Sequence, residues 1–255
     1  MAIYYDNITA AIILSGREYC WKEVSESLID IASRVKSLIV VKNWKKGSSF
    51  DKIYSAWKDK IGNLIEVEGN RKKARTNIEK GELIADNYNR YRRKFLHNRT
   101  EFLLQLEDDA TFPKNALDRI FELLRMYNKA AFSTIHFNHR GYYPDHTGMP
   151  MIWSLETRKT FPAGDSSNEE CISIRSMGRN IRAGHEKVDA AHCNCTLIRS
   201  EFIQKFPFRA RMNGLWGHDL VFGYQVSKMG YHGLVDWTLK GSHYECDEYG
   251  NVVIW

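Results

Sequence analysis

Short apolar segments alternate with amphipathic segments over the first 110 residues, and this alternation limits the folds open to the chain. Residues 9–14 (TAAIIL) and 37–41 (SLIVV) predict two buried strands, and apolar residues at helical spacing over 18–34 predict the helix between them. A strand, a helix and a second strand within about 30 residues have the size of a crossover unit with parallel strands.

The same alternation continues through the rest of this half. A helix beginning near 48, a strand over 64–67, a basic helix over 72–96 and a strand over 101–106 (EFLLQL) follow one another. Four strands separated by helices predict an α/β fold with a mostly parallel central sheet flanked by helices.

The second half of the chain is less regular. It predicts helices over 113–127 and 217–229, and strands over 130–137, 188–199 and 233–239, of which we expect the last to be the final strand. Residues 139–187 have weak periodicity and many polar groups, which predicts a long substrate loop or a mobile one.

The composition is that of a soluble globular protein, with 43% hydrophobic and 27% charged residues. We expect one domain over 1–255. We also expect a cytoplasmic location, because no apolar run approaches the roughly 20 residues of a membrane span and the N-terminus lacks a signal-peptide pattern. Five cysteines in so long a chain do not make a disulfide framework, and Cys193 and Cys195 lack zinc-knuckle spacing, so we expect them to be buried thiols.

The chain carries a net charge of +6, which suits an anionic partner: a nucleotide diphosphate, a nucleic acid or an acidic membrane surface. The charge alone does not choose among these partners.

An acidic triplet, Glu107-Asp108-Asp109, follows the apolar strand over 101–106 directly. Open α/β sheets bind ligands at the carboxyl ends of their strands. Three successive carboxylates repel one another unless they are solvated or neutralised, and oxygen ligands suit a hard divalent cation such as Mg²⁺ or Mn²⁺. The alternative is a solvated loop before the next helix, whose N-terminus favours acidic charge.

Two further residues stand at the ends of predicted elements. Asp219, in the segment WGHDL, falls at the start of a helix, where a carboxylate is held in a fixed place or simply caps the helix. His243 follows the strand over 233–239 and is flanked by Ser242 and Tyr244. Alone, such a histidine is usually structural.

In order along the chain, these segments resemble GT-A fold glycosyltransferases, most closely the inverting enzymes of family 2. LLQLEDDATFPKNAL is similar to the metal-binding DxD segment of that family, and the upstream NRKKARTN is similar to its basic element. AHCNCTLIRSEFIQKFPF resembles its next strand and helix, and GHDLVFGYQVSKMGYHGLVDWTLKGSHYE resembles the segment that carries the catalytic acid residue and the terminal metal-binding histidine. The resemblance departs from the family at Glu107, where Asp is usual, and at His218, where an acidic residue is more frequent.

The resemblance implies transfer of a sugar from a nucleotide-diphosphate sugar to an acceptor hydroxyl. Asp109 and His243 would bind Mn²⁺ or Mg²⁺, and Glu107 or Asp108 would contact the ribose or the metal through water. The metal neutralises charge on the leaving diphosphate. Asp219 would act as general base for one in-line displacement with inversion.

The resemblance also places the two substrates. Residues 1–110 would bind the nucleotide sugar and residues 111–255 the acceptor. Nucleotide contacts are expected from the ends of the first two strands and from the basic element: Ser15, Gly16, Arg17, Asn43 and Arg75. Acceptor contacts are expected from Trp153, Trp216 and His218, because aromatic faces suit sugar rings, with Tyr142, Tyr143 and Arg175 as further candidates in 139–187.

Three other functions remain open on the sequence alone. The same chemistry could act on a modified base in DNA, for which the basic run over 71–94 and Arg175, Arg179, Arg182, Arg209 and Arg211 are available. A nucleotidyltransferase would release pyrophosphate instead, but the sequence has no glycine-rich phosphate loop of the kind that such enzymes often carry. A non-catalytic binding module would have no need of Asp109, Asp219 and His243 together.

Overall fold

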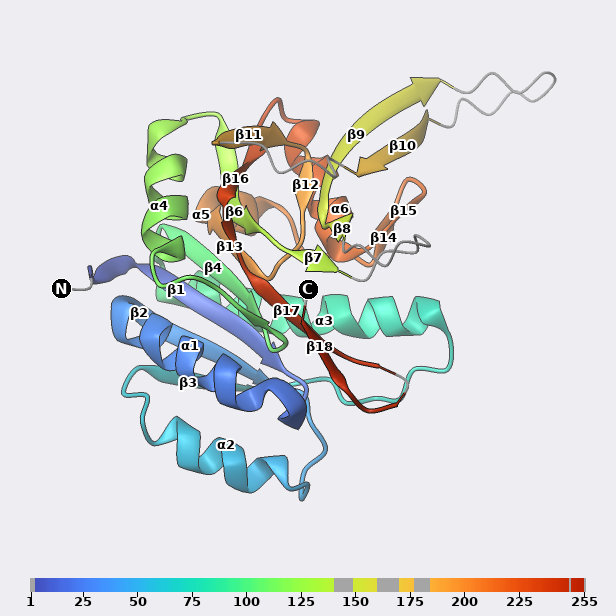
Figure 1. The fold of residues 1–255 in the computed structure, drawn as a ribbon. Coiled ribbons are helices and arrows are strands. Elements are labelled where there is room, and N and C mark those ends of the chain that lie inside the picture. Colours follow the sequence, from blue (N-terminus) through green and yellow to red (C-terminus); the bar gives the residue numbers. More distant parts are fainter. Residues whose placement is uncertain (1–2, 140–148, 160–169, 177–183, 248, 255) are drawn as a thin grey trace.

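The computed structural model describes residues 3–139, 149–159, 170–176, 184–247 and 249–254. An eight-stranded sheet lies at its centre, in the order β11-β16-β6-β13-β4-β1-β2-β3 (Figure 1). These strands are β1 (Tyr5–Leu14), β2 (Val35–Lys42), β3 (Leu64–Glu68), β4 (Phe102–Glu107), β6 (Ala130–His136), β11 (His185–Val188), β13 (Cys195–Arg199) and β16 (His232–Lys240). All but β11 and β13 run in one direction, which confirms the predicted mostly parallel sheet.

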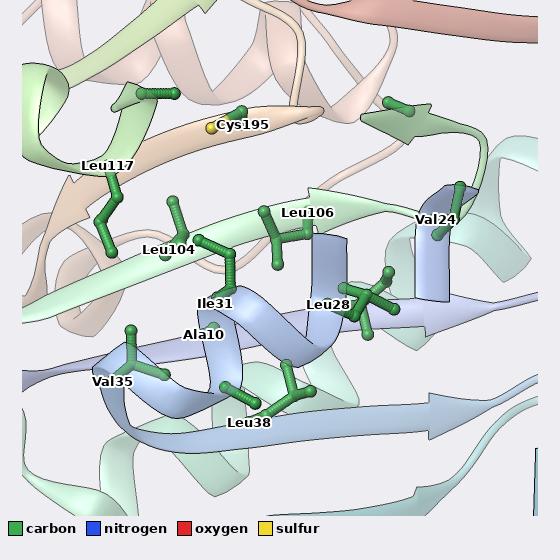
Figure 2. Packing of buried hydrophobic residues seen from close by; sticks show 14 of the residues in the cluster. Ala10, Val24, Leu28, Ile31, Val35, Leu38, Leu104, Leu106, Leu117 and Cys195 are labelled. Carbon is green, nitrogen blue, oxygen red and sulfur yellow. The ribbon is translucent and has the colours of Figure 1, made fainter. Parts of the chain in front are cut away.

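Helices cover both faces of this sheet, and the sheet separates the hydrophobic core into two layers. On one face, α1 (Trp21–Arg34), which follows the short 3₁₀ helix η1 (Glu18–Cys20), packs together with α2 (Phe50–Lys58) and α4 (Ala116–Met126). On the other face lie α3 (Asn77–Asn98), α5 (Ser200–Lys205) and α6 (His218–Ser227). Figure 2 shows Val24, Leu28 and Ile31 of α1 packed over Leu38 of β2 and Leu104 of β4. The apolar runs of the sequence are therefore strands buried on both faces.

Smaller sheets surround the central one. Their strands are β5 (Ala110–Thr111), β7 (Asn138–His139), β8 (Met149–Pro150), β9 (Ile152–Lys159), β10 (Glu170–Ser176), β12 (Ala190–Ala191), β14 (Arg211–Met212), β15 (Leu215–Trp216), β17 (Ser242–Cys246) and β18 (Val252–Ile254). The sheet β18-β17-β5 joins the segment after β4 to the segment after β16. None of the helices in the described part of the chain is long and apolar enough to span a membrane.

Three sequence predictions for the second half are wrong. The expected loop over 139–187 contains the antiparallel pair β9–β10 and the strand β11, whose short and polar segments hide their period of two. The expected strand over 188–199 is divided between β12 and β13, which belong to different sheets. Between them, the Asn194 backbone N–H donates to His192 Nδ1 and turns the chain. The chain also continues past 239 into β17 and β18.

An ion pair between the partly exposed Arg119 and the buried Asp236 fixes α4 to β16. Asp236 is fully buried and accepts hydrogen bonds from Arg119 Nε at 2.6 Å and from the backbone and hydroxyl of Thr238. Burial alone would raise the pKa of Asp236, but the Thr238 and Arg119 hydrogen bonds outweigh it and hold the pKa below its ordinary value of 3.8. The carboxylate therefore stabilises the fold above about pH 4, and this contribution is lost as the pH falls through the lowered pKa.

Replacing Arg119 with Gln should lower the free energy of unfolding at pH 7 by about 2 kcal/mol, because a buried carboxylate loses a charged partner. The deficit should shrink as the pH falls through the lowered pKa of Asp236, because a protonated carboxyl group no longer needs a charged partner. Urea unfolding at several pH values measures both effects. Arg90→Gln removes a pair with Asp86 on α3 whose carboxylate is 36% exposed, and it should cost less than about 1 kcal/mol. Equal losses of unfolding free energy in Arg119→Gln and Arg90→Gln would contradict a special contribution from the pair of Arg119 with the buried Asp236.

Candidate active site

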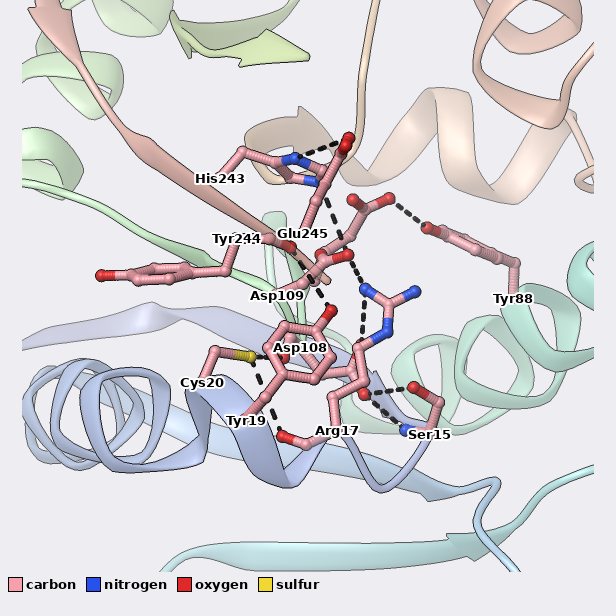
Figure 3. A network of polar contacts seen from close by, with 11 residues as sticks. Ser15, Arg17, Tyr19, Cys20, Tyr88, Asp108, Asp109, His243, Tyr244 and Glu245 are labelled. Carbon is pink, nitrogen blue, oxygen red and sulfur yellow. Dashed lines mark hydrogen bonds and ion pairs between the residues drawn. The ribbon is translucent and has the colours of Figure 1, made fainter. Parts of the chain in front are cut away.

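Glu107 ends β4, and Asp108 and Asp109 form the turn to β5, at the carboxyl ends of the central parallel strands. β5 pairs with β17, so that Ala110 lies opposite His243, and the Tyr244 backbone N–H donates to the Asp109 carbonyl at 2.7 Å. This pairing brings His243 Nε2 to 3.4 Å from Asp109 Oδ2 (Figure 3). Two residues that are 134 positions apart in the chain (243 − 109) therefore face one another.

Glu107, Asp109 and His243 form a group that could hold a metal ion. One ligand atom from each residue lies within 4.8 Å of the other two. Asp109 Oδ1 is buried and has no hydrogen-bond partner among the described residues, so one oxygen of the group is available to a ligand. Two carboxylates and one imidazole fit Mn²⁺ or a similar divalent cation.

The surroundings favour a cation in this group. Burial raises the pKa of Glu107, and nearby Asp219 raises it further. His243, Arg17 and a hydrogen bond from Tyr88 act in the opposite direction. Burial lowers the pKa of His243, which favours the neutral imidazole that metals bind. A buried carboxylate gains from a cation beside it, because burial penalises its charged form.

Asp108 has a different set of partners. Its Oδ2 accepts hydrogen bonds from the backbone N–H and the hydroxyl of Ser15, and its Oδ1 lies 3.5 Å from Arg17 Nη1. Arg17 Nη1 also pairs with Asp109 Oδ2. Asp108 therefore ties the triplet to the segment after β1, and the predicted residues Ser15 and Arg17 lie at the triplet (Figure 3).

The first turn of α6 lies against the same region through Tyr88 of α3. The Tyr88 hydroxyl donates to Glu107 Oε1 at 3.2 Å, and its ring centroid is 4.0 Å from that of His218. Burial lowers the pKa of His218, which favours the neutral ring, while nearby Asp219 opposes this shift. The next residue, Asp219, accepts the Leu220 backbone N–H at 2.9 Å and is partly exposed. Its carboxylate raises the pKa of Glu107, so the two groups lie within electrostatic range.

Gly217 shapes this turn. Its φ is +105°, and a Cβ on it would lie 2.7 Å from Asp219 Oδ1. We expect Gly217→Ala to displace the Asp219 carboxylate, lowering turnover about 100-fold and the unfolding free energy by about 1–2 kcal/mol. Gly214 is the matched control, since its φ is +77° and a Cβ on it would meet nothing within 4 Å. Gly214→Ala should show the stability loss alone, which assays of turnover and urea unfolding on both variants can separate.

The other predicted contact residues lie further apart. Asn43 lines a pocket of about 630 Å³ beside β2 and β3, together with Lys45, Lys46 and Lys72, and its Oδ1 is buried without a partner among the described residues. Gly16 lies against Trp44 at the edge of this pocket.

Arg75 is exposed, and the next residue, Thr76, caps α3 by accepting the Glu79 backbone N–H. Within the described residues, Arg75 has no ion pair with the triplet. These nucleotide-contact roles stay predictions.

The predicted acceptor residues lie on two of the small sheets. Trp216, on β15, is 51% exposed, with the guanidinium carbon of Arg211 at 5.9 Å from its ring centroid. Trp153, on β9, is partly buried and lies opposite Ala190 of β12. Tyr142 and Tyr143 lie outside the described residues, and Arg175 belongs to β10.

Several residues at the site were missed in the sequence. Glu245 lies two residues beyond His243 on β17, with its Oε1 at 3.6 Å from His243 Nδ1, and the period of two in a strand could have indicated it. Tyr88 has no local signal, because its contact with Glu107 crosses from α3 to β4. Asn194 is buried, and neither polar atom of its side chain has a partner among the described residues. Cys193 and Cys195 are buried free thiols, as predicted.

No protein-family model and no curated protein matches the sequence. The solved structures that match most of it include the following two. GalNAc-T7 with UDP, GalNAc and Mn²⁺ matches 93% of this chain and 43% of its own, at 10% identity and a TM-score of 0.59. The mannosyltransferase PcManGT from Pyrobaculum calidifontis, with GDP-Man and Mn²⁺, matches 91% of this chain and 56% of its own, at 12% identity and a TM-score of 0.54.

This chain thus spans about half the length of the proteins that it resembles. At such low identity the likeness concerns the arrangement of the backbone. The match covers the central sheet and the helices on both of its faces, which agrees with the fold expected from the sequence. The chain therefore has the GT-A fold.

Proposed function

We propose that this protein is a glycosyltransferase that moves a sugar from a nucleotide-diphosphate sugar to an acceptor hydroxyl. The observation that carries the proposal is the group Glu107, Asp109 and His243 at the carboxyl ends of the strands of a GT-A fold. The two similar structures hold Mn²⁺ together with UDP or GDP-Man, which supports this reading. Residues 1–110 supply the nucleotide side of the site and residues 111–255 the acceptor side.

Asp109, His243 and Glu107 would hold Mn²⁺ or Mg²⁺ in this scheme. The bound ion would neutralise negative charge that the diphosphate gains as the glycosidic bond breaks. Asp108 keeps the triplet in place, because it is anchored by two hydrogen bonds from Ser15. The nucleotide would lie along Ser15, Gly16 and Arg17 and would also contact Asn43 and Arg75. The pocket that Asn43 lines is rich in lysine, which suits an anionic ligand.

Asp219 is the general base of the proposed reaction. An acceptor hydroxyl is a poor nucleophile at neutral pH and needs a carboxylate that removes its proton as it attacks the anomeric carbon. Asp219 suits this role because Gly217 leaves room for its carboxylate and α6 holds its backbone. A single displacement on the face opposite the leaving diphosphate inverts the anomeric configuration.

The acceptor is held on the α6 side of the site. Trp216 offers an exposed aromatic face, and sugar rings stack on such faces through their C–H groups. His218, directly before the base, and Trp153 complete the proposed acceptor contacts.

The products of the reaction test this function. The protein is incubated with single nucleotide sugars, Mn²⁺ and a mixture of saccharide acceptors, and mass spectrometry follows the nucleotide. A glycosyltransferase releases nucleoside diphosphate and lengthens an acceptor. Release of pyrophosphate from a nucleoside triphosphate and a sugar phosphate would instead show a nucleotidyltransferase. Transfer of the sugar to the opposite anomeric configuration, read by NMR of the product, distinguishes inversion from retention.

A further inference from the structure

Arg17 pairs with a carboxylate of the metal group. Its Nη1 contacts Asp109 Oδ2 and lies 3.5 Å from Asp108 Oδ1 (Figure 3). The same Asp109 oxygen lies 3.4 Å from His243 Nε2. Among the described residues, Arg17 is the one lysine or arginine that makes an ion pair with the acidic triplet. A cation of the chain itself therefore pairs with one oxygen of the carboxylate that a metal ion would use.

The backbone before Arg17 aims this side chain at the triplet. Gly16 has a φ of +85°, and a Cβ on it would lie 2.9 Å from the Trp44 Cβ, so another residue would not fit there without strain. Ser15 is held to Asp108 on the other side. The Arg17 side chain is 38% exposed, so its guanidinium can leave the carboxylates toward solvent without unpacking the core.

The charges in the group explain why the two cations compete. Glu107, Asp108 and Asp109 carry three negative charges when ionised, and Arg17 offsets one of them. A divalent ion on Asp109 would lie next to a guanidinium that cannot lose its proton, and like charges at that distance repel. The diphosphate of a nucleotide offers a new partner, since the fork of arginine matches phosphate oxygens.

We propose that Arg17 is an exchangeable internal cation: it pairs with Asp109 when the site is free of ligand and moves to the donor diphosphate when the metal binds Asp109. This inference rests on the proposed function. Arg17 therefore opposes metal binding in the absence of nucleotide and supports it in the presence of nucleotide. By reciprocity, the metal raises nucleotide affinity by the same factor as the nucleotide raises metal affinity. Arg17 also becomes a direct contact of the leaving group.

Mn²⁺ affinity without nucleotide tests the competition. Free Mn²⁺ is measured by electron paramagnetic resonance during titration of the parent protein and of Arg17→Gln. We expect Arg17→Gln to bind Mn²⁺ about tenfold more tightly, because the competing guanidinium is gone. Arg17→Lys, which keeps the charge on a flexible stem, should bind Mn²⁺ with nearly the affinity of the parent. Arg90→Gln removes an arginine paired with Asp86 on α3 and should leave the affinity unchanged.

The same titrations with UDP or GDP present test the transfer of Arg17 to the diphosphate. In the parent, the better of these nucleotides should raise Mn²⁺ affinity strongly, whereas in Arg17→Gln the increase should be about tenfold smaller. Circular dichroism and thermal unfolding establish that each variant is folded.

The outcomes separate this inference from the proposed function. Equal Mn²⁺ affinity in parent and Arg17→Gln without nucleotide would overturn the competition and leave the metal site standing. Weaker binding by a folded Arg17→Gln would also overturn it, since Arg17 would then organise the carboxylates for the metal. No Mn²⁺ binding by either protein, with or without nucleotide, would remove the metal site of the proposed function and this inference with it.

Discussion

Asp219→Asn should lower the rate of sugar transfer by about 10²–10⁴-fold, the usual contribution of a positioned general base. The amide keeps the size of the side chain but cannot take the acceptor proton. Because Asp219 lies outside the group Glu107, Asp109 and His243, binding of Mn²⁺ and of nucleoside diphosphate should remain within about threefold of the parent. Single-turnover transfer assays and Mn²⁺ titration measure the two effects separately.

Two variants sharpen this test. Asp219→Glu retains a carboxylate on a longer side chain, which displaces the carboxylate from the place beside Gly217 that the Asp219 carboxylate takes. It should keep more activity than Asp219→Asn. Gly217→Ala keeps Asp219 itself and moves it. A folded Asp219→Asn protein that turns over at nearly the parent rate would show that another group removes the acceptor proton.

Asp109→Asn should weaken Mn²⁺ binding by more than about 100-fold and abolish metal-dependent transfer. Asp109 is the member of the triplet with a buried oxygen that has no partner among the described residues, and an amide in its place removes the charge. The matched variant is Asp108→Asn, one residue away. Asp108 contacts Ser15 and Arg17, so Asp108→Asn should lower the stability of the fold. It should weaken Mn²⁺ binding far less than Asp109→Asn does.

Which of the two variants loses more Mn²⁺ affinity tests whether Asp109 binds the metal and Asp108 anchors the triplet. Mn²⁺ titration of both variants, with thermal unfolding as a check on folding, provides the comparison. If Asp108→Asn lost the metal and Asp109→Asn kept it, the metal would lie on the β1 side of the turn, and the pairing of β5 with β17 would have no part in holding it.

The central sheet could be predicted from the sequence because its strands are buried on both faces. Strands such as 9–14 and 37–41 are continuous apolar runs, and amphipathic helices separate them, so the pattern itself dictates parallel pairing. The end of such a strand is also where a ligand binds, so the position of the triplet at 107–109 is enough to mark it as a candidate site.

The strands outside the central sheet could not be predicted because they contain no such apolar run. The alternation in β9 and β10 is too short and polar to stand out from a loop in the sequence. The chain after 239 has the same character, so its sequence indicates His243 as a candidate ligand but does not reveal β17 and β18.

Contacts between distant segments are the other limit. Tyr88 reaches Glu107 from a helix, and Arg17 reaches Asp109 from the segment after β1. The sequence predicts that Arg17 contacts the base or ribose of a nucleotide, but its ion pair with a metal-group carboxylate has no signal in residue order. Only the packing of β1 beside β4 brings these side chains together.

Thermal unfolding with a panel of nucleoside diphosphates and nucleotide sugars, each with and without Mn²⁺, tests the central claim most directly. A ligand at 100 times its Kd adds about 2.7 kcal/mol of stability, which corresponds to a rise in Tm of about 5–10 °C for a chain of this size. The account predicts such a rise for one base family, only with Mn²⁺, and its loss in Asp109→Asn. If no nucleotide raised the Tm with Mn²⁺, the group Glu107, Asp109 and His243 would not be the metal and donor site of a glycosyltransferase.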